Sequence, residues 1–225
     1  MTTGDSTTRQ SYSAPVRIAV YPGSFNPLHI GHLAIMEYLT KKKEYDWVYL
    51  VVSPKNPLKD SISADSGESR YEAASAAVRR HPELHVRVDG IELRMPPPQY
   101  TIKTLDALKA REPGNEFTLV IGADNLQGIR RWRDYQRILS EYGVAVYPRK
   151  GFDVNDLRRQ LIEECKDFPP PYVLDSDEAF SANGLEETLP RSYKIEIIDA
   201  PSVDISSTEI REGLAAGKDM SGFLM

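Results

Sequence analysis

The chain has 225 residues, a net charge of −5 at pH 7 and a sequence pI near 5.5. This acidic balance argues against a general nucleic-acid-binding protein, whose basic surface usually shows in the total charge. The single cysteine, Cys165, excludes an intramolecular disulfide and a cysteine-rich zinc site, and it fits a reducing cytoplasm. No apolar run approaches the about 20 residues of a membrane span, so we expect a cytoplasmic protein that binds neither nucleic acid nor membrane.

The first fifteen residues are polar and lack the apolar core of a signal peptide, so residues 1–15 are predicted to form a disordered tail. After the tail, short apolar runs alternate with amphipathic stretches, as expected of buried strands and surface helices. The runs predicted to be strands are Val16–Tyr21, Trp47–Val52, Leu84–Val88, Phe117–Ile121, Val144–Tyr147 and Tyr193–Ile198. The stretches predicted to be helices are Leu33–Lys42, Glu68–Arg80, Ile102–Arg111, Trp132–Ser140 and Val154–Cys165.

This alternation predicts an α/β fold with a Rossmann-like, doubly wound and mostly parallel sheet in a single domain over residues 16–225. The stretch Phe168–Ser192 breaks the rhythm with three consecutive prolines and several acidic residues, and it is predicted to be a surface insertion at about 168–192. With the common strand order 3-2-1-4-5, ligands bind beyond the carboxyl ends of strands 1 and 4. The segments after Tyr21 and Ile121 are therefore the first places to look for chemistry.

The segment after the first strand reads PGSFNPLHIGH and ends at His32. Gly23 allows the backbone to approach a ligand closely. His29 and His32 lie three positions apart at the start of a predicted helix, so they share one face. A helix N-terminus favours phosphate, and two imidazoles beside it add hydrogen-bond donors. Two alternatives stay open: Asn26-Pro27 as a plain helix cap, and the histidine pair as part of a structural zinc site.

A second unusual segment, DISSTEIR, ends at Arg211 near the end of the chain. Ser206 followed by Glu209 fits a capping box, which predicts a well-capped helix, and Gly217 can end that helix. A serine-rich helix start also offers N–H and hydroxyl donors, and Arg211 adds a fork of donors for phosphate oxygens. The structural and the functional interpretations are compatible.

Together, the two segments resemble the HxGH nucleotidylyltransferase superfamily: the first is similar to its GSF(N/D)PxHxGH motif and the second to its ISSTxIR motif. The four letters HIGH also match class I aminoacyl-tRNA synthetases, but no KMSKS-like segment occurs. Further segments resemble the bacterial nicotinate-nucleotide adenylyltransferases, namely YTIKTL from Tyr100, GADNL from Gly122 followed by Trp132, and VYPR ending at Arg149. The resemblance covers Val16–Cys165 and resumes at Tyr193, with departures from the usual family residues at Pro22, Asn26 and Gln99.

The resemblance implies transfer of the adenylyl group of ATP to nicotinate mononucleotide, forming deamido-NAD and pyrophosphate. It implies catalytic roles for His29, His32 and Arg211. The implied ATP site comprises Gly23, Ser24, Phe25, Asn26, His29, His32, Gly122, Asp124, Ile205, Ser206, Ser207 and Arg211. The implied mononucleotide site comprises Lys59, Tyr100, Thr101, Asp124 and Trp132. No metal site on the protein is implied, because Mg²⁺ would be bound through the ATP phosphates.

Several of these residues also have a structural interpretation: Asp124 or Thr101 as a helix cap, Trp132 as core and Lys59 as a solvated lysine. Two other functions stay open, a pantetheine-phosphate adenylyltransferase and a nucleotide-sensing module without turnover. The former usually lacks GADNL followed by tryptophan, and the joint presence of the two histidines, Ser207 and Arg211 argues against the latter. The sequence leaves the oligomeric state open, with a homo-oligomer among the alternatives.

Overall fold

The computed structural model of the chain describes residues 14–41, 45–54, 66–167, 192–201 and 203–225. Most of the predicted tail over residues 1–15 and of the predicted insertion over 168–192 lies outside these ranges, as does Lys59. Among the described helices, none combines the length and the apolar character that a membrane crossing requires.

Six strands form one sheet in the order β3-β2-β1-β4-β5-β6, and every neighbouring pair is parallel. This confirms the predicted doubly wound sheet and its strand order, with the weak sixth strand added at the edge. The strands are β1 (Arg17–Gly23), β2 (Trp47–Val52), β3 (Val86–Asp89), β4 (Glu116–Gly122), β5 (Val144–Tyr147) and β6 (Ile195–Ile197). Each strand overlaps the run that predicts it.

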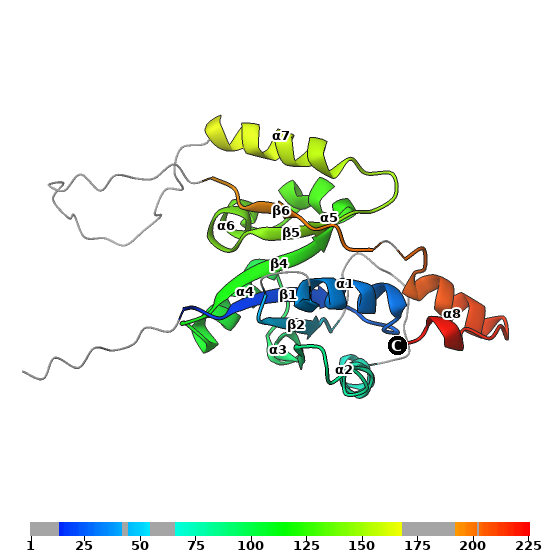
Figure 1. The fold of residues 1–225 in the computed structure, drawn as a ribbon. Helices are drawn as coiled ribbons and strands as arrows, with labels where there is room; N and C mark the ends of the chain where they lie inside the picture. The colour runs from blue at the N-terminus through cyan, green and yellow to red at the C-terminus, as the bar shows by residue number, and fades with distance from the viewer. Residues whose placement is uncertain (1–13, 42–44, 55–65, 168–191, 202) are drawn as a thin grey trace, which may run out of the picture.

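Helices connect the strands and cover both faces of the sheet (Figure 1). The longer helices are α1 (Ile30–Lys41), α2 (Gly67–Val78), α4 (Thr101–Arg111), α7 (Val154–Asp167) and α8 (Ser207–Ala215). The short ones are α3 (Ile91–Arg94), α5 (Ala123–Gln127), η1 (Ile129–Arg131), α6 (Tyr135–Arg137), η2 (Ile138–Tyr142) and η3 (Ser221–Phe223). Helix α8 lies at one end of the sheet, next to α1 (Figure 1).

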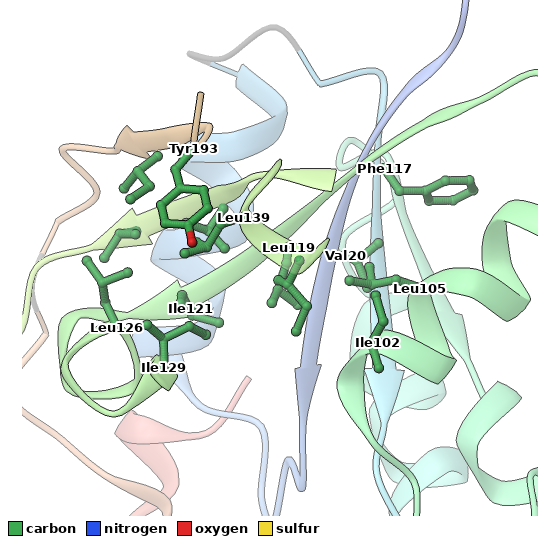
Figure 2. Close-up of a cluster of buried hydrophobic side chains, with 14 of the residues drawn as sticks. Val20, Ile102, Leu105, Phe117, Leu119, Ile121, Leu126, Ile129, Leu139 and Tyr193 are labelled. Carbon is green, nitrogen blue, oxygen red and sulfur yellow. The ribbon is translucent and has the colours of Figure 1, made fainter. Parts of the chain in front are cut away.

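The period-two pattern of the strands divides the core into two clusters, one on each face of the sheet. Ile18 and Val20 of β1 belong to the first core cluster, where they pack with side chains from α4 and α5. Figure 2 shows Val20 beside Ile102 and Leu105 of this cluster. Ala19 and Tyr21 point to the other face and belong to the second core cluster, which includes side chains of α1 and α2.

The predicted helix over Trp132–Ser140 is confirmed only from Tyr135 onward, and its predicted start at Trp132 is wrong. Trp132 ends the 3₁₀ turn η1 in an extended conformation, and Asp134 then adopts a left-handed backbone with φ of 52°. A right-handed helix cannot run through such a residue, so the helix starts again only at Tyr135 and continues as a turn of π-helix over η2. The indole of Trp132 therefore sits in a loop between short turns rather than on a regular helix.

The register of the sheet places the carboxyl ends of β1 and β4 at the same edge. Gly23 pairs with Val52 of β2, and Gly122 at the end of β4 pairs with Tyr147 at the end of β5. Strand order reverses between β1 and β4, because the chain moves outward to β2 and β3 on one side and to β5 on the other. The segments after Gly23 and Gly122 therefore open onto the switch-point crevice where such folds bind ligands.

Candidate active site

The loop that follows β1 is shaped by a phenylalanine that folds back on a glycine. A Cβ added at Gly23 would lie 2.8 Å from the ring of Phe25. Phe25 has a positive φ of 45° and a buried ring, which meets the imidazole of His32 edge-on at 5.2 Å between ring centroids. Gly23 is therefore required by the packing of Phe25, and Phe25 supports His32 from one side.

The two histidines lie side by side at the start of α1, as their spacing predicts. Their ring centroids are 3.8 Å apart. The Nδ1 atom of His29 accepts a hydrogen bond from the Gly31 N–H at 3.1 Å, and the Nδ1 atom of His32 accepts one from the His29 N–H at 3.2 Å. Because each Nδ1 accepts, the hydrogen-bond network assigns the single proton of each neutral ring to Nε2. The imidazoles thus cap backbone N–H groups at the start of α1 and each keep one N–H donor.

The surroundings of the pair favour its neutral form. Burial lowers the pKa of His29 from 6.5 to about 4, with the positive charge of Arg149 acting in the same direction and Glu209 opposing it. Burial also lowers the pKa of His32 well below its ordinary value, helped by His29 and then by Arg149. At neutral pH both rings are therefore uncharged hydrogen-bond donors rather than cations.

Acidification should destabilise the protein through His29. Between pH 6.5 and about 4 the unfolded chain binds a proton at this ring and the folded chain does not, so the stabilising contribution is complete above pH 6.5 and is lost as the pH falls. The contribution of His29 is on the order of 3 kcal/mol over that range. Urea unfolding of the wild-type protein and of His29→Asn across this pH range measures the contribution of His29 to the free energy of unfolding. Asparagine is the chosen replacement because its amide oxygen can still accept the hydrogen bond from the Gly31 N–H. Parallel stability curves for the two proteins would contradict this account.

Helix α8 brings the second motif to the first. The hydroxyl of Ser207 donates to the carbonyl oxygen of Pro27 at 3.0 Å, and Nη1 of Arg211 donates to the carbonyl oxygen of Asn26 at 2.6 Å. These contacts join residues that are 180 and 185 positions apart. The structure thus brings the two segments into direct contact.

The capping box predicted for α8 is present. Ser206 accepts from the backbone N–H of Glu209 at 3.2 Å, and the Glu209 carboxylate accepts from the backbone N–H of Ser206 at 2.8 Å. The Ser206 hydroxyl also donates to that carboxylate at 2.6 Å. The side chain of Ser206 is therefore engaged in capping, which leaves Ser207 and Arg211 as the side chains of this motif that face the loop after β1.

A pocket lies between the histidine pair, the end of β5 and the segment that precedes α8. Its lining includes His29, His32, Arg149, Val203 and Ile205. Gly122 borders the same region, since a Cβ there would lie 2.3 Å from Oδ1 of Asp124 and 3.2 Å from Nε of Arg149. The Asp124 carboxylate itself lies 3.8 Å from the Arg149 guanidinium. Asp124 thus lies beside Arg149, which lines the pocket.

Residues predicted for a mononucleotide gather at the start of α4 and after η1. Tyr100 is the N-cap of α4 and makes no side-chain cap, and Thr101 is the first helical residue. The Tyr100 ring lies 5.5 Å from the charged group of Lys103 and 5.5 Å from that of Arg133, next in sequence to Trp132. Trp132 is partly buried against the first core cluster. The interpretation of Thr101 as the cap of this helix is therefore wrong, because Tyr100 occupies that position.

The prediction from sequence missed two arginines that shape the site. Arg149 lines the pocket, where it bonds to the Tyr147 hydroxyl at 3.3 Å and disfavours a charge on either histidine. Arg70 of α2 is buried and donates to the carbonyl oxygens of Ser24 and Pro54, each at 2.6 Å. Arg70 shares a helical face with Ala74 and Ala77. An arginine on this otherwise apolar face is the feature of the sequence that could have identified it.

Comparisons with known proteins agree with this arrangement. A family model described as cytidylyltransferase-like matches residues 20–213. The chain is 37% identical over 211 residues to a Bacteroides fragilis protein, with 94% of this chain and 88% of the relative covered. It is also 37% identical over 202 residues to a Porphyromonas gingivalis protein, with 90% and 86% covered. Both relatives are named "Probable nicotinate-nucleotide adenylyltransferase".

Solved structures share the fold at lower sequence identity. One is the Plasmodium falciparum nicotinic acid mononucleotide adenylyltransferase complexed with NaAD, which matches with a TM-score of 0.64 at 17% identity over 91% of this chain and 87% of that chain. The same enzyme complexed with APC gives a TM-score of 0.62 at 16% identity over 92% and 90%. At this level of identity the likeness concerns the fold alone.

Proposed function

The chain belongs to the nicotinate-nucleotide adenylyltransferases within the cytidylyltransferase-like family, and we propose that it transfers the adenylyl group of ATP to nicotinate mononucleotide. The observation that carries the proposal is the meeting of the histidine pair with Ser207 and Arg211 at the start of α1. Two neutral N–H donors, a hydroxyl and a guanidinium suit the oxygens of a polyphosphate. The products are deamido-NAD and pyrophosphate.

The reaction needs little chemistry from the protein. The attacking group is the phosphate of the mononucleotide, which is ionised at neutral pH and requires no general base. One of its oxygens bonds to the α-phosphorus of ATP while the bond from that phosphorus to the pyrophosphate oxygen breaks, and the departing pyrophosphate keeps the electron pair. Negative charge builds up on the leaving group, so catalysis consists of in-line positioning and charge stabilisation.

The side chains divide these tasks. We assign the Nε2–H donors of His29 and His32 to the ATP phosphate oxygens around the α-phosphorus. Ser24, Ser207 and Arg211 hold the departing pyrophosphate. The remaining members of the ATP site lie around this point or across the crevice and contact the rest of the nucleotide: Gly23, Phe25, Asn26, Gly122, Asp124, Ile205 and Ser206.

The donor set also bears on Mg²⁺. In the part of the chain that the structure describes, no three His, Cys, Asp or Glu side chains gather as metal ligands, and imidazole N–H and guanidinium groups attract anions. We propose that ATP enters as its Mg²⁺ complex, in which the cation would neutralise phosphate charge and would be held by the nucleotide and water rather than by protein side chains. We place the reaction in the cytoplasm, where these charged substrates are made and used.

A pyrophosphate-release assay tests the function directly. The purified protein is given MgATP with nicotinate mononucleotide, nicotinamide mononucleotide or phosphopantetheine in turn. Release with nicotinate mononucleotide, together with formation of deamido-NAD, is the expected result. Release only with phosphopantetheine would identify the alternative enzyme, and binding of ATP without release in any reaction would identify a nucleotide-sensing module.

The acid mononucleotide should be preferred to the amide. Helix α4 begins at Thr101 without a side-chain cap, so the N–H groups of its first turn suit a carboxylate. An amide nitrogen would place a donor against those donors, at a cost of about 1–3 kcal/mol, which is roughly a tenfold to hundredfold lower kcat/KM. The ratio of kcat/KM for the two mononucleotides at saturating MgATP measures the preference. Equal values would contradict the role of α4.

Trp132→Ala should raise the KM for the mononucleotide far more than that for ATP. The indole lies in a loop rather than within a helix, next in sequence to Arg133, which contacts the Tyr100 ring, and it is only partly buried. Stacking of an aromatic side chain on a nucleobase contributes roughly 1–3 kcal/mol. Trp47→Ala is the matched control, because Trp47 is the only other tryptophan in the chain and is 42% exposed. An unchanged mononucleotide KM with a sharply lowered Tm would identify Trp132 as core.

A further inference from the structure

The segment after α8 turns back on the helix. Gly217 has a φ of +73°, and the backbone N–H groups of Gly217 and Lys218 donate to the carbonyl oxygens of Leu214 and Gly213 at 3.0 and 2.9 Å. Met220–Met225, hereafter the strap, then packs against α8. A Cβ at Gly213 would lie 2.6 Å from the Met220 sulfur, so this glycine allows the strap to lie directly on the helix.

The far end of the strap contacts the histidine loop through its backbone. Leu224 pairs with His29 in an isolated antiparallel bridge, while the Leu224 side chain is 39% exposed. Met225 is buried in the second core cluster, and its carbonyl oxygen accepts a hydrogen bond from the Arg80 guanidinium. The strap is thus held on both sides of the point where it meets His29.

The unit formed by α8 and the strap therefore touches three of the four residues of the loop 26–29. Arg211 bonds to the carbonyl of Asn26, Ser207 bonds to that of Pro27, and Leu224 pairs with His29. The ring of His29 is held by the Gly31 N–H and by the neighbouring His32 ring, and its backbone carbonyl accepts from the N–H groups of His32 and Leu33 in the first turn of α1. Its direction consequently depends on where the backbone of residue 29 is held.

We propose that the strap is a positioning element for adenylyl transfer, with the backbone of Leu224 fixing the His29 imidazole against the ATP phosphates. The inference rests on the proposed role of His29. It differs from a purely structural role because the contact is made by backbone while the Leu224 side chain faces solvent. Loss of the bridge should therefore affect the reacting geometry more than the stability of the fold.

Two substitutions at one position separate backbone from side chain. Leu224→Pro removes the backbone N–H that donates to the Ser221 carbonyl oxygen at 3.2 Å and disfavours the helical turn of η3 at the preceding residue. The strap should then leave the position in which Leu224 pairs with His29. Leu224→Ala keeps the backbone. A misplacement of about 1 Å can cost about a hundredfold in rate, and we expect Leu224→Pro to lower kcat by at least about tenfold. The KM for the mononucleotide should change by less than about twofold, as is typical when an interaction of the transition state is lost. Leu224→Ala should behave like the wild-type protein.

The His29 ring supplies a readout that does not depend on turnover. In ¹⁵N NMR, the wild-type ring should carry its proton on Nε2 and titrate near pH 4. In Leu224→Pro it should exchange between tautomers and titrate closer to 6.5. Deletion of residues 224–225 is the second variant and should reproduce both changes if Leu224→Pro does not fold.

The outcomes are distinct. A kcat for Leu224→Pro within about twofold of the wild-type value, or an unchanged His29 titration in a folded variant, would overturn the proposal. An equal loss of kcat in Leu224→Ala would also overturn it, because the side chain would then be responsible. A wild-type protein that forms no deamido-NAD would refute the proposed function instead, while the NMR comparison would still test the strap.

Discussion

Replacing His32 by asparagine should leave a folded protein whose kcat is lower by about 10²–10³-fold, the usual effect of losing one donor to the transition state. The Nδ1 atom of His32 accepts from the backbone N–H of His29, and the amide oxygen of asparagine can take over that acceptance. The Nε2–H donor has no equivalent in asparagine. The substitution therefore removes the chemistry of the ring and keeps its structural hydrogen bond.

His85→Asn is the control for this experiment. The His85 ring stacks on the exposed Trp47 and lies away from the pocket lining, so its loss should not alter kcat. Steady-state kinetics and thermal unfolding of both variants give the answer. A near-normal kcat for His32→Asn, with its Tm preserved, would remove His32 from the catalytic residues.

Arg211→Ala should lower kcat/KM for ATP by about tenfold to hundredfold, because a hydrogen bond to a charged group contributes about 1.5–3 kcal/mol. The guanidinium holds the Asn26 carbonyl at 2.6 Å and also contacts the Thr208 hydroxyl at 3.1 Å. It therefore anchors the histidine loop while offering its remaining N–H groups to the pyrophosphate. Loss of the side chain removes both effects.

Arg211→Lys should fall between the wild-type protein and Arg211→Ala, since lysine keeps the charge and loses the planar fork. Leu214→Ala, on the exposed side of the same helix, should match the wild-type protein. The mononucleotide KM should change less than that of ATP in both arginine variants. If Arg211→Ala affected the two substrates equally, the side chain would serve only to anchor the loop.

Strands β2 and β5 could be predicted from the sequence because each is buried on both faces, which requires a continuous apolar run. The run at Trp47–Val52 matches β2 residue for residue, and that at Val144–Tyr147 matches β5. The stretch after β4 could not be predicted in the same way. It consists of turns of a few residues, and no glycine or proline at Asp134 indicates that its backbone is left-handed.

The site shows a similar division. The histidine pair, Ser207 and Arg211 were predictable because each belongs to a short contiguous motif with a local physical reason, a helix start. Arg70 and the strap act through carbonyl oxygens and backbone pairing far away in the chain. No spacing rule connects such partners, because any residue has a carbonyl group to offer.

The distance in sequence between the two halves of the site bears on how the protein is made. The entropic free-energy cost of closing a loop of 180 residues is only modestly larger than that of closing a short loop. The long separation in sequence therefore lowers the stability of the native protein only a little. The order in which the two halves of the site are synthesised is fixed, however, because a ribosome adds about 5–20 residues per second from the N-terminus onward. A nascent chain that has passed Tyr147 already carries strands β1–β5 yet lacks every contact that α8 makes with the histidine loop. The contacts between α8 and the histidine loop can therefore form only after Arg211 has been added, and a ribosome stalled before that point would hold a sheet without them.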